Sequence, residues 1–241
     1  MLTGKQFKRA FISGANNILN HRKDVDALNV FPVPDGDTGT NMSMTSSAAV
    51  RELQVVSDDE DLSIVAAKTA AALLRGARGN SGVILSLVFR GISNGFKGKK
   101  EVGGKDLAAA LTLGKESAYK AVMKPTEGTI LTVVRKAAAA AEALASDDCG
   151  AVLDEAYRAA QEALAETPEL LPVLKEAGVV DAGGQGFLYI LDGIRGYINE
   201  GKFIESNDDA SPAKSNAEES KSVVAAASGD IKYGYCSEFL I

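Results

Sequence analysis

Apolar residues recur every three or four positions along most of residues 1–200. The first run consists of Phe7, Phe11, Ile12, Ala15, Ile18 and Leu19. Further runs of this kind cover residues 40–54, 61–75, 82–95, 106–123, 129–146, 150–165, 169–177 and 185–199. This spacing is typical of one buried helix face. No segment combines polar and apolar alternation with hairpin turns, so the pattern predicts an all-α fold.

Small residues predict how these helices pack. Stretches such as AAKTAAALL and RKAAAAAEALA let neighbouring helices approach closely, which suits an antiparallel bundle with short loops. One boundary is marked by Thr167, Pro168 and Glu169, the order expected for an N-cap, a first-turn proline and a first-turn acid. We therefore expect a separate helix to begin there.

Charge and cysteine usage exclude several classes of function. The formal net charge is −6 and the basic residues are interleaved with acids, so we expect no nucleic-acid partner. Cys149 and Cys236 are far apart and belong to no Cys/His cluster, which predicts neither a disulfide framework nor a zinc site and fits a reducing cytoplasm. No leader peptide and no apolar run of about 18 residues is readable, so we expect no membrane span.

The single histidine, His21, removes most mechanisms that use a histidine base or ligand cluster. It stands in NHRKD at a predicted helix end, where we expect it to act as a C-terminal cap.

The composition changes after Phe203. Residues 204–229 are rich in Ser, Ala, Asn and charge, which predicts a flexible linker. The apolar and aromatic segment IKYGYCSEFLI follows, and a lone strand of this kind needs partners. We expect residues 1–203 to form one domain and residues 230–241 to begin a second domain that is cut short.

The string NVFPVPDGDTGTNM, residues 29–42, carries the clearest chemical signal. Pro32 and Pro34 stiffen an extended segment. Asp35 and Asp37 flank Gly36 and, two residues apart, point the same way, so both carboxylates can face one hard cation such as Mg²⁺ or two cations side by side. The helix that follows opens with four residues whose N–H groups and dipole favour phosphate: Thr38, Gly39, Thr40 and Asn41.

Other readings of this string are less satisfactory. An EF-hand loop starting at Asp35 needs Gly and Glu where Thr40 and Ser46 stand. An aspartyl-phosphate phosphatase motif needs threonine in place of Gly39 and an apolar strand just before it. The remaining alternative is an ordinary Asp-Gly turn with a helix cap.

Three more glycine-bearing loops precede predicted helices. RGARGNSGVILS contains Gly79, Asn80, Ser81 and Gly82, which can present backbone N–H groups and a hydroxyl to phosphate, although no Walker A lysine follows. KPTEGTILTV contains Thr129 and Ile130, and EAGVVDAGGQGF isolates Asp181 among glycines. The four loops form one site if the four helix starts lie at one end of a bundle.

In this order, the loops resemble the nucleotide-binding domain of the dihydroxyacetone kinase L-subunit superfamily. Within it, ALNVFPVPDGDTGTNM, ARGNSGVILS, KPTEGTILTV and VDAGGQGF are similar to bacterial fatty acid kinase, which works with DegV-type fatty-acid-binding proteins. The resemblance covers residues 1–203, and YGYCSEFLI is similar to the opening of that kinase's middle domain.

The resemblance implies an antiparallel barrel of eight helices with Mg-ATP at one end. Asp35 and Asp37 would hold a pair of Mg²⁺ ions, and Thr38, Thr40 and Asn41 would contact phosphate or metal-bound water. Gly79 to Gly82, with Ser81, would cradle the phosphates. Thr129 and Ile130 would lie near the adenine, and Asp181 near the base or ribose.

Some positions depart from the dihydroxyacetone branch of the superfamily. That branch has a third metal-binding aspartate, where the nearest candidates here are Asn29 and, further off, Asp26. It often has histidine in place of Thr38. Cys236 is similar to a metal ligand of the middle domain, but its histidine partners are absent from this chain, so no zinc is expected.

The expected activity is ATP-dependent transfer of the γ-phosphoryl group to a fatty acid held by a DegV-type carrier, as in phospholipid precursor metabolism. A carboxylate acceptor is ionised near neutral pH and needs no general base. We expect this chain to bind ATP with little or no turnover. The alternatives are an ATP-binding subunit of a dihydroxyacetone (glycerone) kinase and a non-catalytic nucleotide-binding module. A homodimer of the full-length protein stays open.

Overall fold

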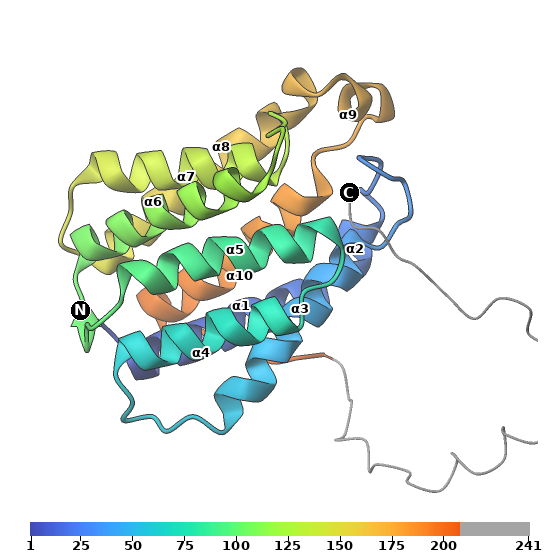
Figure 1. The fold of residues 1–241 in the computed structure, drawn as a ribbon. Helices are drawn as coiled ribbons and strands as arrows, with labels where there is room; N and C mark the ends of the chain where they lie inside the picture. The colour runs from blue at the N-terminus through green and yellow to red at the C-terminus, as the bar shows by residue number, and fades with distance from the viewer. Residues whose placement is uncertain (208–241) are drawn as a thin grey trace, which may run out of the picture. The chain divides into compact units, whose positions relative to one another are not determined.

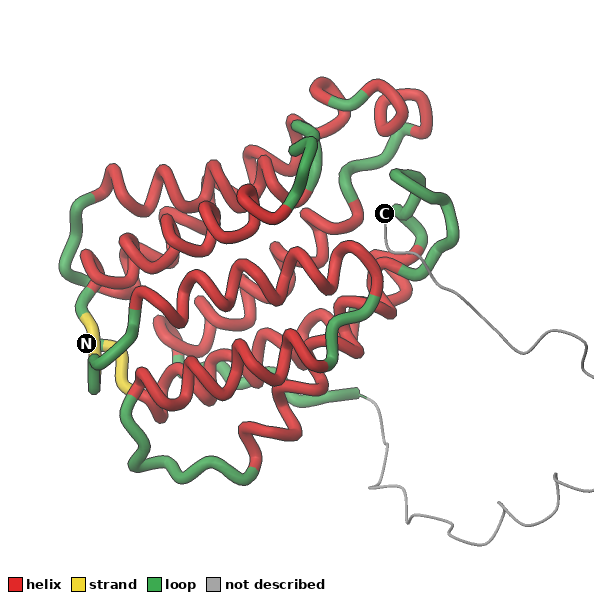
Figure 2. The backbone as a smooth tube through the Cα atoms, in the orientation of Figure 1, coloured by secondary structure: helices red, strands yellow, loops and turns green. Residues whose placement is uncertain are grey.

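In a computed structural model, which describes residues 1–207, most of the described residues are helical (Figure 2). The eight long helices within this range confirm the predicted fold class: α1 (Gly4–Asn20), α3 (Thr38–Gln54), α4 (Leu62–Arg75), α5 (Gly79–Gly95), α6 (Gly104–Ala121), α7 (Ile130–Leu144), α8 (Cys149–Leu170) and α10 (Ala182–Glu200). Two short helices are α2 (Arg22–Asp26) and α9 (Pro172–Ala177).

The long helices close into an antiparallel barrel (Figure 1). Going round the barrel, α1 packs on α3, α3 on α4, α4 on α5, α5 on α6, α6 on α7, α7 on α8, α8 on α10, and α10 on α1. Helix α3 packs against α1, α4, α5 and α10. The starts of α3, α5, α7 and α10 lie at one end of the barrel, on the right in Figure 1.

Glycines make the closest helix crossings. A Cβ added at Gly193 of α10 would lie 2.6 Å from the Cα of Gly14 in α1. A Cβ at Gly91 of α5 would lie 2.2 Å from the carbonyl oxygen of Leu113 in α6. Buried alanines such as Ala137 and Ala160 fill the apolar interior. The predicted close packing is therefore present, with glycine at its tightest points.

The prediction that a helix starts at Thr167 is wrong. Helix α8 runs through Pro168 to Leu170, and α9 begins only at Pro172. Pro168 has no N–H for the carbonyl of Leu164. The Thr167 hydroxyl donates to that carbonyl at 2.7 Å, which lets the helix continue.

The all-α prediction also missed a small sheet. Strand β1 (Leu2–Thr3) pairs antiparallel with β2 (Glu101–Val102), with Leu2 opposite Val102. Such two-residue strands are too short for a period-2 pattern. His21 is the C-cap of α1, as predicted.

Residues 204–207 lie along α1. The Asn16 side chain donates to the carbonyl of Ile204 at 2.8 Å, and the Asn20 side chain donates to the carbonyl of Glu205 at 2.9 Å. The remainder of the predicted linker, the predicted second-domain start at 230–241 and Cys236 lie outside the described residues. None of the helices in residues 1–207 is long and apolar enough to cross a membrane.

Candidate functional site

The acidic loop between α2 and α3 holds its first carboxylate with a side-chain amide. Asn29, only 7% exposed, donates Nδ2 to Asp35 Oδ1 at 2.6 Å. Gly36, with φ of 66°, turns the chain between the two aspartates, in a conformation that suits glycine. The Phe31–Pro32 peptide bond is cis. Asp35 is therefore oriented before any ligand arrives.

Asp37 occupies the N-cap position of α3 but makes no capping hydrogen bond with its side chain within the described chain. Burial raises the pKa of Asp37, and the neighbouring carboxylate of Asp35 raises it further, while a hydrogen bond from Asn41 opposes the shift. Two carboxylates this close repel each other when both are ionised. A cation between them would relieve this repulsion.

The second loop lies against the first turns of α3. Gly79, with φ of 57°, starts α5, and a Cβ added there would lie 2.5 Å from Asn41 Nδ2. The backbone N–H of Arg78 donates to Thr45 Oγ1 at 3.1 Å. The N-cap residue of α5, Arg78, makes no side-chain capping bond in the part of the chain described.

These two loops line a pocket of about 170 Å³ that is partly open to solvent. Its lining contains the two aspartates and the starts of both helices: Asn29, Pro32, Val33, Asp35, Asp37, Thr38, Asn41, Gly79, Asn80 and Ser81. A pair of carboxylates thus faces two helix N-termini that their own N-cap side chains leave open. Such N-termini attract phosphate.

The donor set of this pocket fits Mg²⁺ bound together with phosphates. Mg²⁺ prefers oxygen ligands and is commonly held by one or two carboxylates plus substrate phosphates and water. Within residues 1–207, no three His, Cys, Asp or Glu side chains are grouped as a metal site. The carboxylate pair of Asp35 and Asp37 would therefore hold the metal only with oxygens from a ligand or from polar neighbours.

Three of the predicted phosphate residues make contacts inside the protein. Thr40 donates its N–H to Asp26 Oδ1 at 2.9 Å and its hydroxyl to Asp26 Oδ2 at 2.7 Å. Gly39 lets the carbonyl of Arg22 approach α3, since an added Cβ would lie 2.1 Å from that oxygen. Gly82 packs on Thr45 in the same way, since a Cβ added there would lie 2.4 Å from Thr45 Oγ1. None of the three is in the pocket lining described above.

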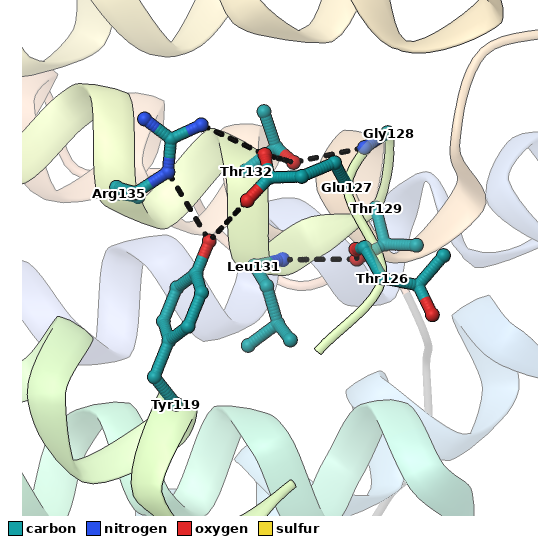
Figure 3. A network of polar contacts seen from close by, with 8 residues as sticks. All are labelled: Tyr119, Thr126, Glu127, Gly128, Thr129, Leu131, Thr132 and Arg135. Atoms are coloured by element: carbon teal, nitrogen blue, oxygen red, sulfur yellow. Dashed lines mark hydrogen bonds and ion pairs between the residues drawn. The ribbon is translucent and has the colours of Figure 1, made fainter. Parts of the chain in front are cut away.

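The third loop, between α6 and α7, is tied down by a polar network (Figure 3). The Glu127 carboxylate accepts hydrogen bonds from Tyr119 at 3.2 Å, from Thr132 at 2.7 Å and from Arg135 at 2.7 Å. The hydroxyl of Thr129 accepts from the N–H of Leu131 at 3.4 Å and so caps α7. This loop is anchored to both helices that it joins.

Asp181 caps the fourth helix start. It is 5% exposed, and its Oδ2 accepts from the N–H of Gly184 at 2.7 Å. Burial raises the pKa of Asp181 to about 6, although hydrogen bonds from the backbones of Gly184 and Ile130 oppose the shift. The same carboxylate thus contacts the starts of α10 and α7. Ile130 and Asp181 meet there, and neither they nor Thr129 line the pocket.

The four helix starts nevertheless form one contiguous region. An added Cβ at Gly183 of α10 would lie 3.3 Å from Ile130 of α7, and one at Gly186 would lie 2.6 Å from Met42 Sδ of α3. The contact between Gly79 and Asn41 links α3 to α5. The predicted convergence of the four loops at one end of the bundle is present in the structure.

Sequence reasoning missed two features of this region. Helix α2 is only five residues long and carries no helical period, so its role as a support for α3 had no signal. Pro32 and Val33 line the pocket, whereas the sequence predicted only that this segment is extended and rigid. The amide contact of Asn29 with Asp35 had a signal in the polar residue that precedes the prolines.

Comparison with known proteins identifies the family. The model of the family described as DAK2 domain matches residues 32–196. Protein YloV of Bacillus subtilis (strain 168) is 43% identical over 246 residues, which cover 100% of this chain and 44% of that protein. An uncharacterized protein of Staphylococcus haemolyticus is 42% identical over 243 residues, again covering 100% of the chain and 44% of the relative. The chain thus spans less than half of these relatives.

The fold is similar to that of a solved kinase. The crystal structure of the dihydroxyacetone kinase from C. freundii in complex with AMP-PNP and Mg²⁺ matches with a TM-score of 0.60 and 19% identity, over 78% of this chain and 33% of that chain. The native form matches with a TM-score of 0.56 and 21% identity, over 78% of this chain and 34% of that chain. Since the family match spans residues 32–196 of the 241, the chain belongs to the DAK2 domain family.

Proposed function

We propose that this domain binds Mg-ATP and supplies the γ-phosphoryl group for the phosphorylation of a fatty acid carboxylate in the cytoplasm. The acid is presented by a separate carrier protein of the DegV type, and the product is an acyl phosphate. The observation that carries the proposal is the pocket in which Asp35 and Asp37 face the open starts of α3 and α5. The dihydroxyacetone kinase of similar fold, solved with AMP-PNP and Mg²⁺, supports it.

The two halves of the pocket have complementary charge. Asp35 and Asp37 would hold Mg²⁺, one ion or a pair, with Asn29 as the candidate third ligand. The N–H groups at the starts of α3 and α5, with the Ser81 hydroxyl, would bind phosphate oxygens. When bound, Mg²⁺ would supply positive charge that offsets the charge of the nucleotide phosphates. Thr129, Ile130 and Asp181 mark the neighbouring region toward which the nucleoside would extend.

A carboxylate acceptor suits the titratable groups at this site. In the transfer, an acceptor carboxylate oxygen bonds to the γ-phosphorus, the bond to the ADP oxygen breaks, and no proton has to move. Among the lining residues, only Asp35 and Asp37 titrate, and the proposal assigns both to the metal. His21 instead pairs with Asp24 at 2.9 Å and stacks on Tyr189. The site therefore fits an acceptor that is already ionised.

Calorimetry tests nucleotide binding. ATP is titrated into the chain with and without Mg²⁺, and we expect affinity to rise with Mg²⁺ in the unsubstituted protein. The pair Asp35→Asn with Asp37→Asn should abolish that rise. A matched control removes two acids that pair with lysines elsewhere, Asp106→Asn with Asp147→Asn. Unchanged Mg²⁺ dependence in the first pair would refute the assignment.

A second experiment tests the acceptor. The chain, and a protein with the length of its relatives, are each incubated with γ-labelled ATP and one acceptor. The acceptors are a carrier loaded with fatty acid, free fatty acid and dihydroxyacetone. Label in an acyl phosphate only with the longer protein and the loaded carrier is the expected result. Label in dihydroxyacetone phosphate would replace the fatty acid assignment with the triose one.

A further inference from the structure

Both carboxylate oxygens of Asp26 accept hydrogen bonds from one residue of α3, Thr40. Its Oδ1 accepts from the N–H of Thr40 at 2.9 Å and its Oδ2 accepts from the Thr40 hydroxyl at 2.7 Å. Thr40 is the third residue of α3, so its N–H is one of those that the helix itself cannot pair. Asp26 therefore caps α3 from another helix, in place of Asp37.

The backbone of α2 is fitted to the same turn. A Cβ at Gly39 would lie 2.1 Å from the carbonyl oxygen of Arg22 and 2.9 Å from the Cβ of Val25. Val25 is fully buried. Helix α2 is thus held against the first turn of α3 by packing as well as by the two hydrogen bonds that Thr40 donates to Asp26.

This arrangement leaves Asp37 free to face the pocket. An aspartate at an N-cap ordinarily turns its side chain back onto the helix N–H groups. Asp37 stands at the N-cap and makes no such bond within residues 1–207, while it lines the pocket beside Asp35. Because Asp26 already satisfies the Thr40 N–H, Asp37 is not needed as the cap.

We propose that Asp26 is a positioning residue of the metal site and is not a metal ligand. By capping α3 through Thr40, it holds the first helical turn so that Asp37 and Thr38 face the pocket. The proposal rests on the metal-nucleotide function proposed above, and it gives Asp26 a role that its sequence position left open.

The test measures the binding of Mn²⁺ in the presence of ATP by electron paramagnetic resonance. Asp26→Ala removes both bonds to Thr40, and we expect it to weaken Mn²⁺ about tenfold, in the range typical of residues that orient metal ligands. Asp26→Asn keeps an acceptor for the Thr40 N–H and should stay within about threefold of the unsubstituted chain. Asp35→Asn, which removes a ligand, should weaken Mn²⁺ binding more than Asp26→Ala does.

Two further variants separate positioning from charge and from stability. Asp24→Asn removes an acid from the same helix, one that pairs with His21, and should leave Mn²⁺ affinity unchanged. Thr40→Val removes only the hydroxyl bond to Asp26 and should weaken Mn²⁺ less than Asp26→Ala does. Adding it to Asp26→Ala should cause little further loss, because Asp26→Ala already removes that bond. This non-additivity, with rescue by asparagine, is not expected from a loss of stability alone.

Several results would overturn the inference. A loss in Asp26→Asn as large as that in Asp35→Asn would make Asp26 a direct ligand. Affinity within threefold of the unsubstituted chain in Asp26→Ala, or additive losses with Thr40→Val, would remove the positioning role while the proposed function stands. If the unsubstituted chain binds no Mn²⁺ with ATP, the proposed function itself fails and this inference falls with it.

Discussion

The network around Glu127 leads to a prediction about the stability of the α6–α7 loop. Glu127 accepts hydrogen bonds from Tyr119, Thr132 and Arg135 (Figure 3). The perturbation is a double-mutant cycle with Glu127→Ala, Arg135→Ala and the pair. We expect the two residues to be energetically coupled, because Arg135 reaches the same carboxylate that the buried Thr132 hydroxyl uses.

The expected magnitude follows from exposure and partners. The side chains of Arg135 and Glu127 are 38% and 47% exposed, so solvent screens their attraction and a coupling of about 1 kcal/mol is expected. Glu127→Ala also leaves the hydroxyl of Thr132, which is 0% exposed, without its acceptor, at a further cost of about 1 kcal/mol. The single variant should therefore lose about 2 kcal/mol of unfolding free energy.

The pH dependence of this coupling has a defined sign. Burial raises the pKa of Glu127, but hydrogen bonds from Arg135 and Thr132 outweigh it, so the pKa lies below its ordinary value of 4.5. A carboxyl with a lowered folded-state pKa stabilises the fold above its unfolded pKa, and this stabilisation is lost as the pH falls through the folded pKa. The coupling should be present at pH 7 and should shrink as the pH is lowered below 4.5.

Urea unfolding at pH 7 and at lower pH measures both effects. The matched control is the pair of Glu169 and Lys175, whose side chains are 68% and 62% exposed, so that solvent screens their attraction more strongly and a smaller coupling is expected. A coupling between Glu127 and Arg135 no larger than that of the control pair would refute the reasoning. So would a coupling that grows as the pH falls.

Two other predictions concern Asp181 and Gly79. The pKa of Asp181 is raised to about 6 from 3.8, so the stability that it contributes is full below pH 3.8 and falls as the pH rises through 6. The change amounts to about 3 kcal/mol. Asp181→Asn should remove this slope from urea unfolding curves, and an unchanged slope would contradict the assignment. Gly79→Ala forces alanine to a φ of 57° and against Asn41, and should cost about 1–2 kcal/mol together with Mg²⁺-dependent ATP affinity. Gly178→Ala, at a φ of 67° with open space around it, should affect stability only, and equal losses of affinity would refute the difference.

The long helices could be predicted from the sequence because each one has apolar residues at spacings of three and four, which form its buried face. The helix boundaries that were predicted wrongly or missed depend on contacts with backbone carbonyls or with another helix, which the apolar pattern does not contain. Pro168 is typical of a helix start, but α8 continues to Leu170, and the Thr167 hydroxyl donates to the Leu164 carbonyl that Pro168 cannot reach. Helix α2 has five residues and one buried side chain, Val25. Its position depends on Gly39 in the next helix, and no local pattern encodes that contact.

The candidate site was predictable to the extent that neighbours in sequence are neighbours in the pocket. Asp35, Asp37 and Thr38 lie within four residues, and the stiff loop that carries them could be read directly. The pairing of Thr40 with Asp26, and of Asp181 with the start of α7, joins residues far apart in sequence. A small polar residue at a helix start looks the same whether a ligand or another helix satisfies it.

The caps divide the four helix starts into two kinds. Helices α7 and α10 are capped by their own N-cap side chains, those of Thr129 and Asp181. Helices α3 and α5 lack such caps within the described residues, and both open onto the pocket. Unpaired N–H groups at a helix start cost free energy unless water or a ligand satisfies them. At α3 the Thr40 N–H is already paired with Asp26, so a bound anion there would use the N–H groups that precede Thr40, and at α5 it would use those that the N-cap side chain leaves open. The metal-bearing and phosphate-binding halves of the proposed site thus coincide with the two helices whose N-cap side chains face the pocket or make no cap bond. The two helices capped by Thr129 and Asp181 support the region toward which the nucleoside would extend.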